Sequence, residues 1–574
     1  MLIYKDVIKK YKTQELIKQI TYLTDKMNSV SSSVLYSNAA ELLLRYGEFE
    51  SAVTDSLSSG EDIYSGFTAG LRTAGELTGA IYTSVINNEQ PSPGISASFN
   101  ELFSRRIFPA SLNISVPEGY AFYSLYPEMY IDAAMKFVNS YQAGHVVVIG
   151  IRGIGCSLAS VVSAVLRQNG WNARSFTVRP RGEYFNRKLC VSLELKQELL
   201  KIPGAKYLIA DEGPGLSGSS FSSVAGYLSS NGIPDNDIIF FPSWDADGST
   251  FVSEESRIRW QRHKKIFVSF EESVIESGKL KRAFGYDSIQ DISAGKWRSL
   301  FFEDNKNYPH TFAGAEQRKY LISRDGEKSI LKFSGLGHYG LKLFERAKIL
   351  QEAGFSPRTG KTDYGFIEFE FLKGKQLAVK QKSAKLTDRL AEYIAFTGRN
   401  FPEAPAMDTD ELKEMIRINI EKGLGKKWTM MLKRNMFLRD SDYLERSAAI
   451  DGRMLPFEWI SVNGVYMKTD SLQHHISHFI PGSADIAWDL AGAIIEFRLG
   501  GSKSGKHLTS TYIDLSGDLN ITKRLPFYIA AYAAFRLGYT EFAAERSGDI
   551  QEMRKLKYQS NYYKSILREI LSRP

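Results

Sequence analysis

The chain has 574 residues, of which 43% are hydrophobic and 24% are charged, which predicts several globular domains with sizeable cores. The formal net charge of +8 is modest for this length. It suits anionic ligands such as nucleotides and does not require nucleic acid as a partner, and a generally solvated basic surface explains it equally well.

The cysteines and the apolar stretches indicate a cytoplasmic, bacterial-type enzyme. Cys156 and Cys190 give no disulfide framework, which fits a reducing compartment. The N-terminus has no signal-peptide hydrophobic region. The longest apolar stretch, residues 145–166, is interrupted by Arg152 and three glycines, so we expect no membrane span and no membrane partner.

Residues 1–115 are predicted to be mainly helical, because apolar residues recur at helical spacing, as in Ala39–Arg45. Ser/Gly-rich breaks near 56–66 and the segment Pro91–Gly94 interrupt this pattern. No catalytic motif is present. The segment is interpreted as a cap on the next domain or as a recognition element.

Residues 116–275 are predicted to form a parallel α/β sheet, because apolar strands alternate with helical patterns. Parallel strands place ligands at their carboxyl ends, where both glycine-bearing turns of this region lie. The predicted helices are 129–141 and 157–167, and the predicted strands are 120–124, 145–150, 173–178, 207–210 and 237–241.

The strand at 207–210 ends in two adjacent carboxylates, Asp211 and Glu212, followed by the small-residue loop Gly213–Ser220 and a helical pattern. Adjacent acids can hold vicinal sugar hydroxyls or a hydrated Mg²⁺. A Gly/Ser loop at a helix N-terminus presents N–H groups to a phosphate. The alternative is an ordinary strand–loop–helix crossover.

This pattern resembles the phosphoribosyl-diphosphate (PRPP) loop of type I phosphoribosyltransferases, in which two acids close a strand and a Ser/Thr-Gly-Ser/Thr loop wraps the 5-phosphate. The resemblance implies that Asp211 and Glu212 hold the ribose hydroxyls of PRPP. The 5-phosphate and the diphosphate with Mg²⁺ would then bind to two further motifs, which are Ser217-Gly218-Ser219-Ser220 and Arg152-Gly153-Ile154-Gly155.

Two features of this region leave alternatives open. The segment Gly213-Pro214-Gly215 makes the gap between the acids and the loop longer than in that family. The basic segment Arg179–Lys188 could close over a diphosphate leaving group or be a solvated loop, and a Gly-x-Gly turn such as 153–155 is common.

From residue 305 onward the pattern changes to a β-hairpin over 319–333 with a tight turn at Asp325-Gly326, a helix over 341–350 and a strand over 366–371. A strand lysine, Lys332, precedes a helix glutamate, Glu345. This layout resembles the small lobe of aminoglycoside-phosphotransferase-like kinases. It implies that Lys332 holds the α/β-phosphates of ATP, that Glu345 orients it, and that a hinge lies near 368–374. The alternative is a surface lysine on a hairpin.

The pattern that follows resembles the large lobe of the same family. It consists of an acid, Asp451, a short loop, two strands joined by Asn463-Gly464, and a second acid, Asp470. By resemblance, Asp451 is the catalytic aspartate that accepts the acceptor's proton, Asp470 binds Mg²⁺, and Asp489 braces the catalytic loop.

Two residues of the family pattern are absent. Ala449 and Pro456 stand where that family has a histidine and a metal-binding asparagine. Glu458 is therefore expected to replace the asparagine as a metal ligand.

Two further motifs are interpreted as having no catalytic role. Gly500–His507 spells Gly-x-x-x-x-Gly-Lys but ends in His507 and follows a helix, so a flexible basic loop is expected. His474, His475 and His478 have no acid or cysteine at zinc spacing and are expected in a loop near the kinase site.

The predicted fold class is multidomain α/β and α+β. A helical segment (1–115) is followed by a phosphoribosyltransferase-like parallel-sheet domain (116–275), a linker (276–304) and a bilobal kinase-like domain (305–574). The predicted function is a bifunctional transferase that uses PRPP, ATP and Mg²⁺ on small-molecule substrates, including a hydroxyl acceptor. The covalent linkage of the two domains motivates the hypothesis that the two reactions act in series.

The alternative is a PRPP- or nucleotide-sensing regulatory or defence protein whose kinase domain is degenerate. A nucleic-acid-binding protein is supported by the net charge alone. The acceptors and the oligomeric state have no signal in the sequence.

Overall fold

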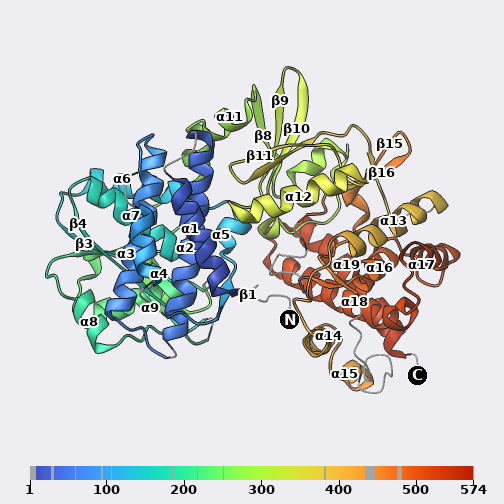
Figure 1. The fold of residues 1–574 in the computed structure, drawn as a ribbon. Coiled ribbons are helices and arrows are strands. Elements are labelled where there is room, and N and C mark those ends of the chain that lie inside the picture. Colours follow the sequence, from blue (N-terminus) through green and yellow to red (C-terminus); the bar gives the residue numbers. More distant parts are fainter. Residues whose placement is uncertain are drawn as a thin grey trace. The chain divides into compact units, whose positions relative to one another are not determined.

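A computed structural model describes residues 8–572 except 28–31, 59, 92–94, 105–106, 184, 216, 250, 380–382, 433–445, 473 and 475–480. The described chain divides into two compact units. The N-terminal unit comprises Ile8–Gly285 with Gly335–Tyr339, and the C-terminal unit comprises Tyr286–Ser334 with 340–572 (Figure 1). In the part of the chain that the structure describes, no helix is both long enough and apolar enough to cross a membrane.

The N-terminal unit contains a five-stranded, all-parallel sheet in the order β4-β3-β5-β6-β7, which confirms the predicted parallel sheet. Its interior strand β3 is buried from its second residue onward, as its unbroken apolar sequence predicts. The strands are β3 His145–Ile151, β4 Asn172–Val178, β5 Lys206–Ala210, β6 Ile238–Phe241 and β7 Lys264–Lys265.

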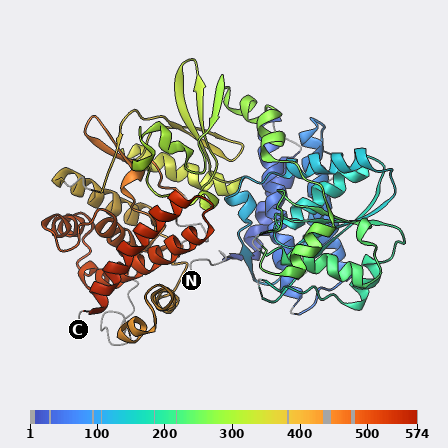
Figure 2. The same cartoon turned by 180° about the vertical axis from the view of Figure 1, so that it is seen from behind.

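Helices connect these strands and lie on both faces of the sheet. Figure 2 brings the green helices of residues 219–262 to the front, with the blue N-terminal helices behind the sheet. The connecting helices are α6 Pro127–Ser140, α7 Gly155–Gln168, α8 Leu193–Leu199, α9 Ser219–Ser230 and α10 Glu254–Arg262, and α11 Lys279–Phe284 ends the unit.

The strand predicted at 120–124 is wrong, because residues Glu118–Ala121 form a single helical turn, α5. Pro117 starts this turn. The N–H of Gly119 then donates to the Glu212 carboxylate at 2.8 Å, and the N–H of Leu125 donates to the Gly119 carbonyl at 3.0 Å. These turn contacts leave no extended backbone for a sheet.

The N-terminal helices pack in the same unit as the parallel sheet. Gly79 of α3 lies so close to the backbone of Ser160 in α7 that a Cβ atom would clash. Arg72 of α3 donates to the Cys156 carbonyl at 3.1 Å and pairs with Glu50 at 3.0 Å. The helices are α1 Thr13–Lys26, α2 Ser32–Leu57, α3 Gly66–Ile86 and α4 Ile95–Ser104, and β1 Ile8–Lys12 pairs antiparallel with β2 Ser111–Ser115.

The C-terminal unit starts with a five-stranded antiparallel sheet in the order β11-β12-β10-β9-β8. The predicted hairpin and tight turn are confirmed, because Asp325 and Gly326 both have positive φ between β9 and β10. The strands are β8 Ser288–Asp291, β9 Lys319–Arg324, β10 Glu327–Phe333, β11 Thr359–Asp363 and β12 Phe366–Glu370, and the helix α12 spans His338–Glu352.

The rest of the C-terminal unit is mainly helical. Two small sheets join β13 Lys375–Gln376 with β15 Trp459–Val462 and β16 Val465–Lys468, and β14 Ser447–Ala448 with β17 Ala484–Asp485. The helices are α13 Ala384–Asn400, α14 Thr409–Leu424, α15 Lys426–Leu432, α16 Ala487–Glu496, α17 Lys503–Ser516, α18 Ile521–Arg546 and α19 Ile550–Ser572.

The expected basic loop at Gly500–His507 is instead the start of α17. Ser502 caps this helix, because its Oγ accepts the Gly505 N–H at 3.1 Å. Gly505 and Lys506 therefore lie in the first turn of a helix.

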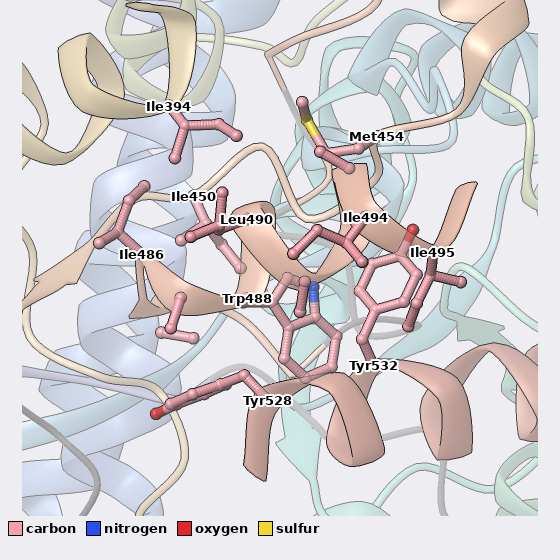
Figure 3. Close-up of a cluster of buried hydrophobic side chains, with 14 of the residues drawn as sticks. Ile394, Ile450, Met454, Ile486, Trp488, Leu490, Ile494, Ile495, Tyr528 and Tyr532 are labelled. Atoms are coloured by element: carbon pink, nitrogen blue, oxygen red, sulfur yellow. The ribbon is translucent and has the colours of Figure 1, made fainter. Parts of the chain in front are cut away.

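The core of this helical region holds the loop that carries Asp451. Trp488 of α16 packs edge-on against Tyr532 of α18, and Ile450 and Met454, on either side of Asp451, are fully buried in the same cluster (Figure 3). Packing therefore fixes both ends of the short segment on which the predicted catalytic acid lies.

Candidate active site

The backbone of the Asp451 loop is held by Asp489, as expected from the sequence. The Asp489 carboxylate accepts the N–H groups of Asp451 at 2.7 Å and Gly452 at 2.9 Å. Burial and the neighbouring charge of Asp451 raise the pKa of Asp489. Asp489 thus braces the loop from α16 and does not face the cavity described below.

The Asp451 carboxylate is fully buried and has partners on both oxygens. Tyr393 donates its hydroxyl to Oδ2 at 2.6 Å, and His474 Nδ1 lies 3.3 Å from Oδ1. Lys468 Nζ lies 3.3 Å from Oδ2. Burial raises the pKa of Asp451, but attraction by Lys468 and the contacts with His474 and Tyr393 together outweigh burial and lower the pKa to about 2. Asp451 is therefore an ionised carboxylate at neutral pH.

Lys332 of β10 and Asp470, which follows β16, form an ion pair. Lys319 Nζ lies 3.7 Å from the same carboxylate. Burial lowers the pKa of Lys332. Burial raises the pKa of Asp470, but attraction by Lys332, Lys319, His474 and Arg453 together outweighs burial and holds that pKa well below its usual value. The structure brings these two predicted residues together.

Glu345 does not take the role predicted for it. It is an exposed residue of α12, and Lys332 pairs with Asp470 instead. The neighbouring Arg346 is buried, and donates to the Ala449 carbonyl at 2.7 Å and to the Ser471 carbonyl at 3.2 Å. Arg346 therefore connects the segment before Asp451 to the segment after Asp470. The sequence pattern predicts a role for the adjacent Glu345 and does not predict this contact.

Glu458 is enclosed by two cations. Lys468 Nζ lies 2.7 Å from Oε2, and an Arg453 Nη atom lies 2.6 Å from Oε1. Glu458 also belongs to a group with Asp451 and His474 whose ligand atoms are close enough to hold a metal ion. The Lys468 ammonium already contacts both carboxylates of this group, so a metal ion there would have to replace it, and the metal role of Glu458 stays a prediction.

His474 is the described member of the predicted histidine loop, and it lies between Asp451 and Asp470. Its Nδ1 lies 3.3 Å from Asp451, and its Nε2 lies 3.7 Å from Asp470. Burial lowers the pKa of His474, so the positive charge beside Asp451 at neutral pH comes from Lys468. His475 and His478 lie outside the described residues.

A cavity that opens to solvent lies beside Lys332, Glu458 and Asp470. Near β13, the buried Gln376 Oε1 has no hydrogen-bond partner among the residues that the structure describes. The other walls are aromatic, aliphatic or cationic and include Ile330, Phe369, Leu372, Ile460, Trp297, Phe457, Tyr539, Arg453 and Arg536. An apolar lining with a few charged and polar groups is typical of a nucleotide or small-molecule site.

In the N-terminal unit, the two predicted acids lie after β5 in a buried setting. Glu212 accepts the Gly119 N–H at 2.8 Å, and burial raises the pKa of Glu212 well above its usual value. Burial raises the pKa of Asp211 to about 6. Glu212 therefore binds a backbone amide in the position where the sequence predicts a ribose hydroxyl.

The serine loop takes the form expected for the start of a helix. Gly218 has a φ of 61°, and α9 begins at Ser219. Ser217 Oγ accepts the Ser219 N–H at 3.2 Å. Arg187, from the basic segment 179–188, donates to Ser220 Oγ at 2.8 Å. The structure thus brings the basic segment to this loop.

Arg152 does not face a ligand site. Its fully buried guanidinium donates to Asp55 at 2.8 Å and to the Thr177 carbonyl at 3.2 Å, and it also pairs with Asp62. Gly153, with a φ of 113°, and Gly155, whose Cβ would meet the Ala210 carbonyl oxygen, are required by the backbone. The predicted diphosphate contact of Arg152 is replaced by structural ion pairs.

No protein-family model matches the chain, and no curated protein matches its sequence. Its structure is similar to that of the choline kinase LicA from Streptococcus pneumoniae, with 16% identity over 52% of this chain and 99% of that chain and a TM-score of 0.34. It is also similar to a Plasmodium vivax ethanolamine kinase, with 10% identity over 61% of this chain and 95% of that chain and a TM-score of 0.36. A spectinomycin phosphotransferase is similar with 10% identity over 52% of this chain and 97% of that chain and a TM-score of 0.33. These structures lend no support to the predicted phosphoribosyl transfer, and at such identities they assign no substrate.

Proposed function

We propose that the C-terminal unit is an ATP-dependent phosphotransferase that acts on the hydroxyl group of a small molecule. The observation that carries the proposal is the ion pair between Lys332 and Asp470 on the wall of a cavity that opens to solvent. Asp451 lies on the neighbouring loop, ionised and braced by Asp489. A lysine, an ion-binding acid and a proton acceptor are the groups that phosphoryl transfer needs.

Each residue has a role that follows from its position. Lys332 would bind the α/β-phosphates, since its ammonium is buried at the cavity wall. Asp470 would hold Mg²⁺, which binds through one or two carboxylates plus phosphate oxygens and supplies charge neutralisation when bound. Gln376 Oε1 is a free acceptor for a base amino group. Asp451 would accept the proton of the attacking hydroxyl.

A protein that binds nucleotide without turnover is the alternative for this unit. One observation favours it: Asp451 is 1% exposed, with Tyr393, Lys468 and His474 on its carboxylate. Nucleotide binding with no ADP formation for any acceptor would support this alternative over phosphotransfer.

The proposal is tested by calorimetry with ATP·Mg²⁺ and by ADP formation in the presence of a panel of acceptors. Choline, ethanolamine and spectinomycin, named for the similar structures, are the first acceptors to test. Lys332→Met removes a charge-assisted contact to phosphate, so we expect ATP affinity to fall about 10- to 100-fold. Lys328→Met, on the exposed part of the same strand, is the matched control. Equal affinity in both variants would exclude the assigned role of Lys332.

We keep the binding of a phosphorylated sugar such as PRPP as a second candidate function, for the N-terminal unit. The observation that favours it is sheet order: β3 connects to β4 on one side, whereas β5, β6 and β7 extend on the other. Ligands of open parallel sheets bind where the strand order reverses, and the turn at 152–155 and the loop at 211–220 both follow the strands at that point.

Phosphoribosyl transfer itself stays a prediction from the sequence. Calorimetry with PRPP·Mg²⁺ tests the binding step, with Ser220→Ala as the variant and Ser230→Ala, at the other end of α9, as its control. Binding that weakens only in Ser220→Ala supports the loop as the phosphate site. If calorimetry shows no heat of binding and a second binding assay also detects no binding, PRPP is excluded as a ligand.

A further inference from the structure

Lys468, the last residue of β16, is a fully buried lysine whose ammonium is surrounded by oxygen atoms. Its Nζ lies 2.7 Å from Glu458 Oε2 and 3.3 Å from Asp451 Oδ2. It also donates to the backbone carbonyls of Arg453 at 3.1 Å and Asp470 at 2.6 Å. Two carboxylates and two carbonyls thus converge on one ammonium group.

This oxygen set is the kind that otherwise binds a hard cation. Carboxylates and backbone carbonyls are the preferred ligands of Mg²⁺ and Ca²⁺. The distances of 2.6–3.3 Å are those of ammonium hydrogen bonds, and they exceed a Mg²⁺–oxygen bond of about 2.1 Å. The backbone holds the lysine here as well, because Lys468 pairs with Trp459 in the β15–β16 hairpin and its N–H donates to the Phe355 carbonyl at 2.7 Å.

A second cation secures the same carboxylate. Arg453 lies 2.6 Å from the other oxygen of Glu458, so both oxygens of Glu458 face positive groups. Two buried carboxylates without positive partners would be costly, and the two cations remove that cost. Glu458 and Asp470 both line the cavity. A divalent ion at Glu458 would have to displace the Lys468 ammonium, which four oxygen atoms hold, whereas at Asp470 it would compete with the Lys332 ammonium, the group proposed to bind the nucleotide phosphates.

We propose that Lys468 is a built-in cation that takes the place of a metal ion between Asp451 and Glu458, so that the nucleotide complex holds one divalent ion, at Asp470. This inference rests on the proposed phosphotransferase function and deepens it. The fixed ammonium supplies a positive charge beside Asp451 without any ion from solution. It also accounts for Pro456, because no metal-binding amide is needed at a position where a lysine neutralises the acids.

The test counts bound Mn²⁺ by electron paramagnetic resonance on the full chain, titrated with and without a non-hydrolysable ATP analogue. We expect one nucleotide-dependent Mn²⁺ per wild-type chain. Lys468→Met should gain a second Mn²⁺, because Asp451 and Glu458 then lack their ammonium. The double variant Lys468→Met/Glu458→Gln should return to one. Lys506→Met, an exposed lysine of α17, is the matched control and should bind one.

Glu458→Gln keeps the test decisive even where Lys468→Met does not fold. Under this inference Glu458 is not a metal ligand, so Glu458→Gln should still bind one Mn²⁺ with unchanged affinity. Two Mn²⁺ in the wild type, with one lost in Glu458→Gln, would overturn the inference and leave the phosphotransferase proposal standing. The absence of nucleotide-dependent Mn²⁺ in the wild type, with no ATP binding by calorimetry, would overturn both.

Discussion

Two buried carboxylates, Asp451 and Asp489, meet in the catalytic loop and have different partners. Asp451 contacts the ammonium of Lys468, which keeps its pKa low, whereas Asp489 contacts two backbone N–H groups and has a raised pKa. The full charge therefore lies on the acid that is proposed to accept a proton. The second acid fixes the geometry of the loop.

Among the residues outside the cavity, Arg346 is the one whose substitution we expect to lower the stability of the fold most. Its guanidinium donates to the carbonyls of Ala449 and Ser471 from a buried position. In Arg346→Met these buried carbonyls lose their donor, so we expect the free energy of unfolding to fall by about 3 kcal/mol in urea titrations. Lys342→Met, exposed on the same helix, should change stability little. Equal stability of both variants would show that the Arg346 contacts are not needed.

The sequence allowed us to predict residues that belong to a local motif. It did not reveal residues whose role depends on contacts between segments that are far apart in the chain. Asp489 holds the backbone of the Asp451 loop as its motif predicts, whereas Lys332 pairs with Asp470 and not with the predicted Glu345. His474 reaches Asp451 from a different segment, which supplies an imidazole where Ala449 leaves the family pattern without one. No spacing rule could show that contact, nor the pairing of Arg152 with Asp55 and Asp62 in the N-terminal unit.

At the scale of elements, helices α18 and α19 are joined by Glu541, which contacts Lys564 at 2.8 Å and also pairs with Lys557. Burial raises the pKa of Glu541, but its hydrogen bonds to the lysines outweigh burial and lower the pKa to about 2. The folded-state pKa lies below the unfolded value. The pair therefore stabilises the fold above about pH 4.5, and this contribution is lost as the pH falls towards 2.

Glu541→Gln should therefore cost about 2 kcal/mol of unfolding free energy at pH 7, a value reduced from the full shift because the lysines are partly exposed. The difference from the wild type should shrink by pH 3. Urea unfolding at both pH values measures it, with Glu545→Gln, exposed on the same helix, as the control. A cost that is the same at pH 7 and pH 3 would contradict the assigned ion pair.

Element prediction succeeded where local chemistry decides the backbone. The Asp325-Gly326 and Asn463-Gly464 turns fix two hairpins, because both residues of each pair have positive φ. It failed at 120–124, where an apolar run is short and tertiary contacts to Glu212 and Leu125 impose a helical turn. The start of α17 was missed because its signal is one capping serine, Ser502.

At the scale of the whole molecule, the predicted helical segment, 1–115, does not stand apart. Its described residues belong to one compact unit with the parallel sheet, and Arg72 and Gly79 contact α7 directly. Alternating strands and helices predicted the sheet, but sequence periodicity does not tell which surface a helix covers. The boundaries at 115, 275 and 304 stay predictions.

The two proposed ligands should mark different parts of the chain in hydrogen–deuterium exchange. We expect ATP·Mg²⁺ to slow exchange in β10 and in residues 450–470, because Lys332, Asp451 and Asp470 lie there. PRPP·Mg²⁺ should slow exchange in residues 211–220 and leave the C-terminal unit unchanged. Protection of 211–220 by ATP, with none in β10, would contradict the assignment of the nucleotide site.

The most direct test of the central claim is transfer of labelled γ-phosphate from ATP to an acceptor by the full chain, compared among the wild type, Asp451→Asn and Asp514→Asn, an exposed acid of α17. Loss of the proton acceptor should lower the rate constant for transfer by about 10²- to 10⁴-fold with ATP binding retained, and Asp514→Asn should match the wild type. Transfer at the wild-type rate by Asp451→Asn would contradict the account.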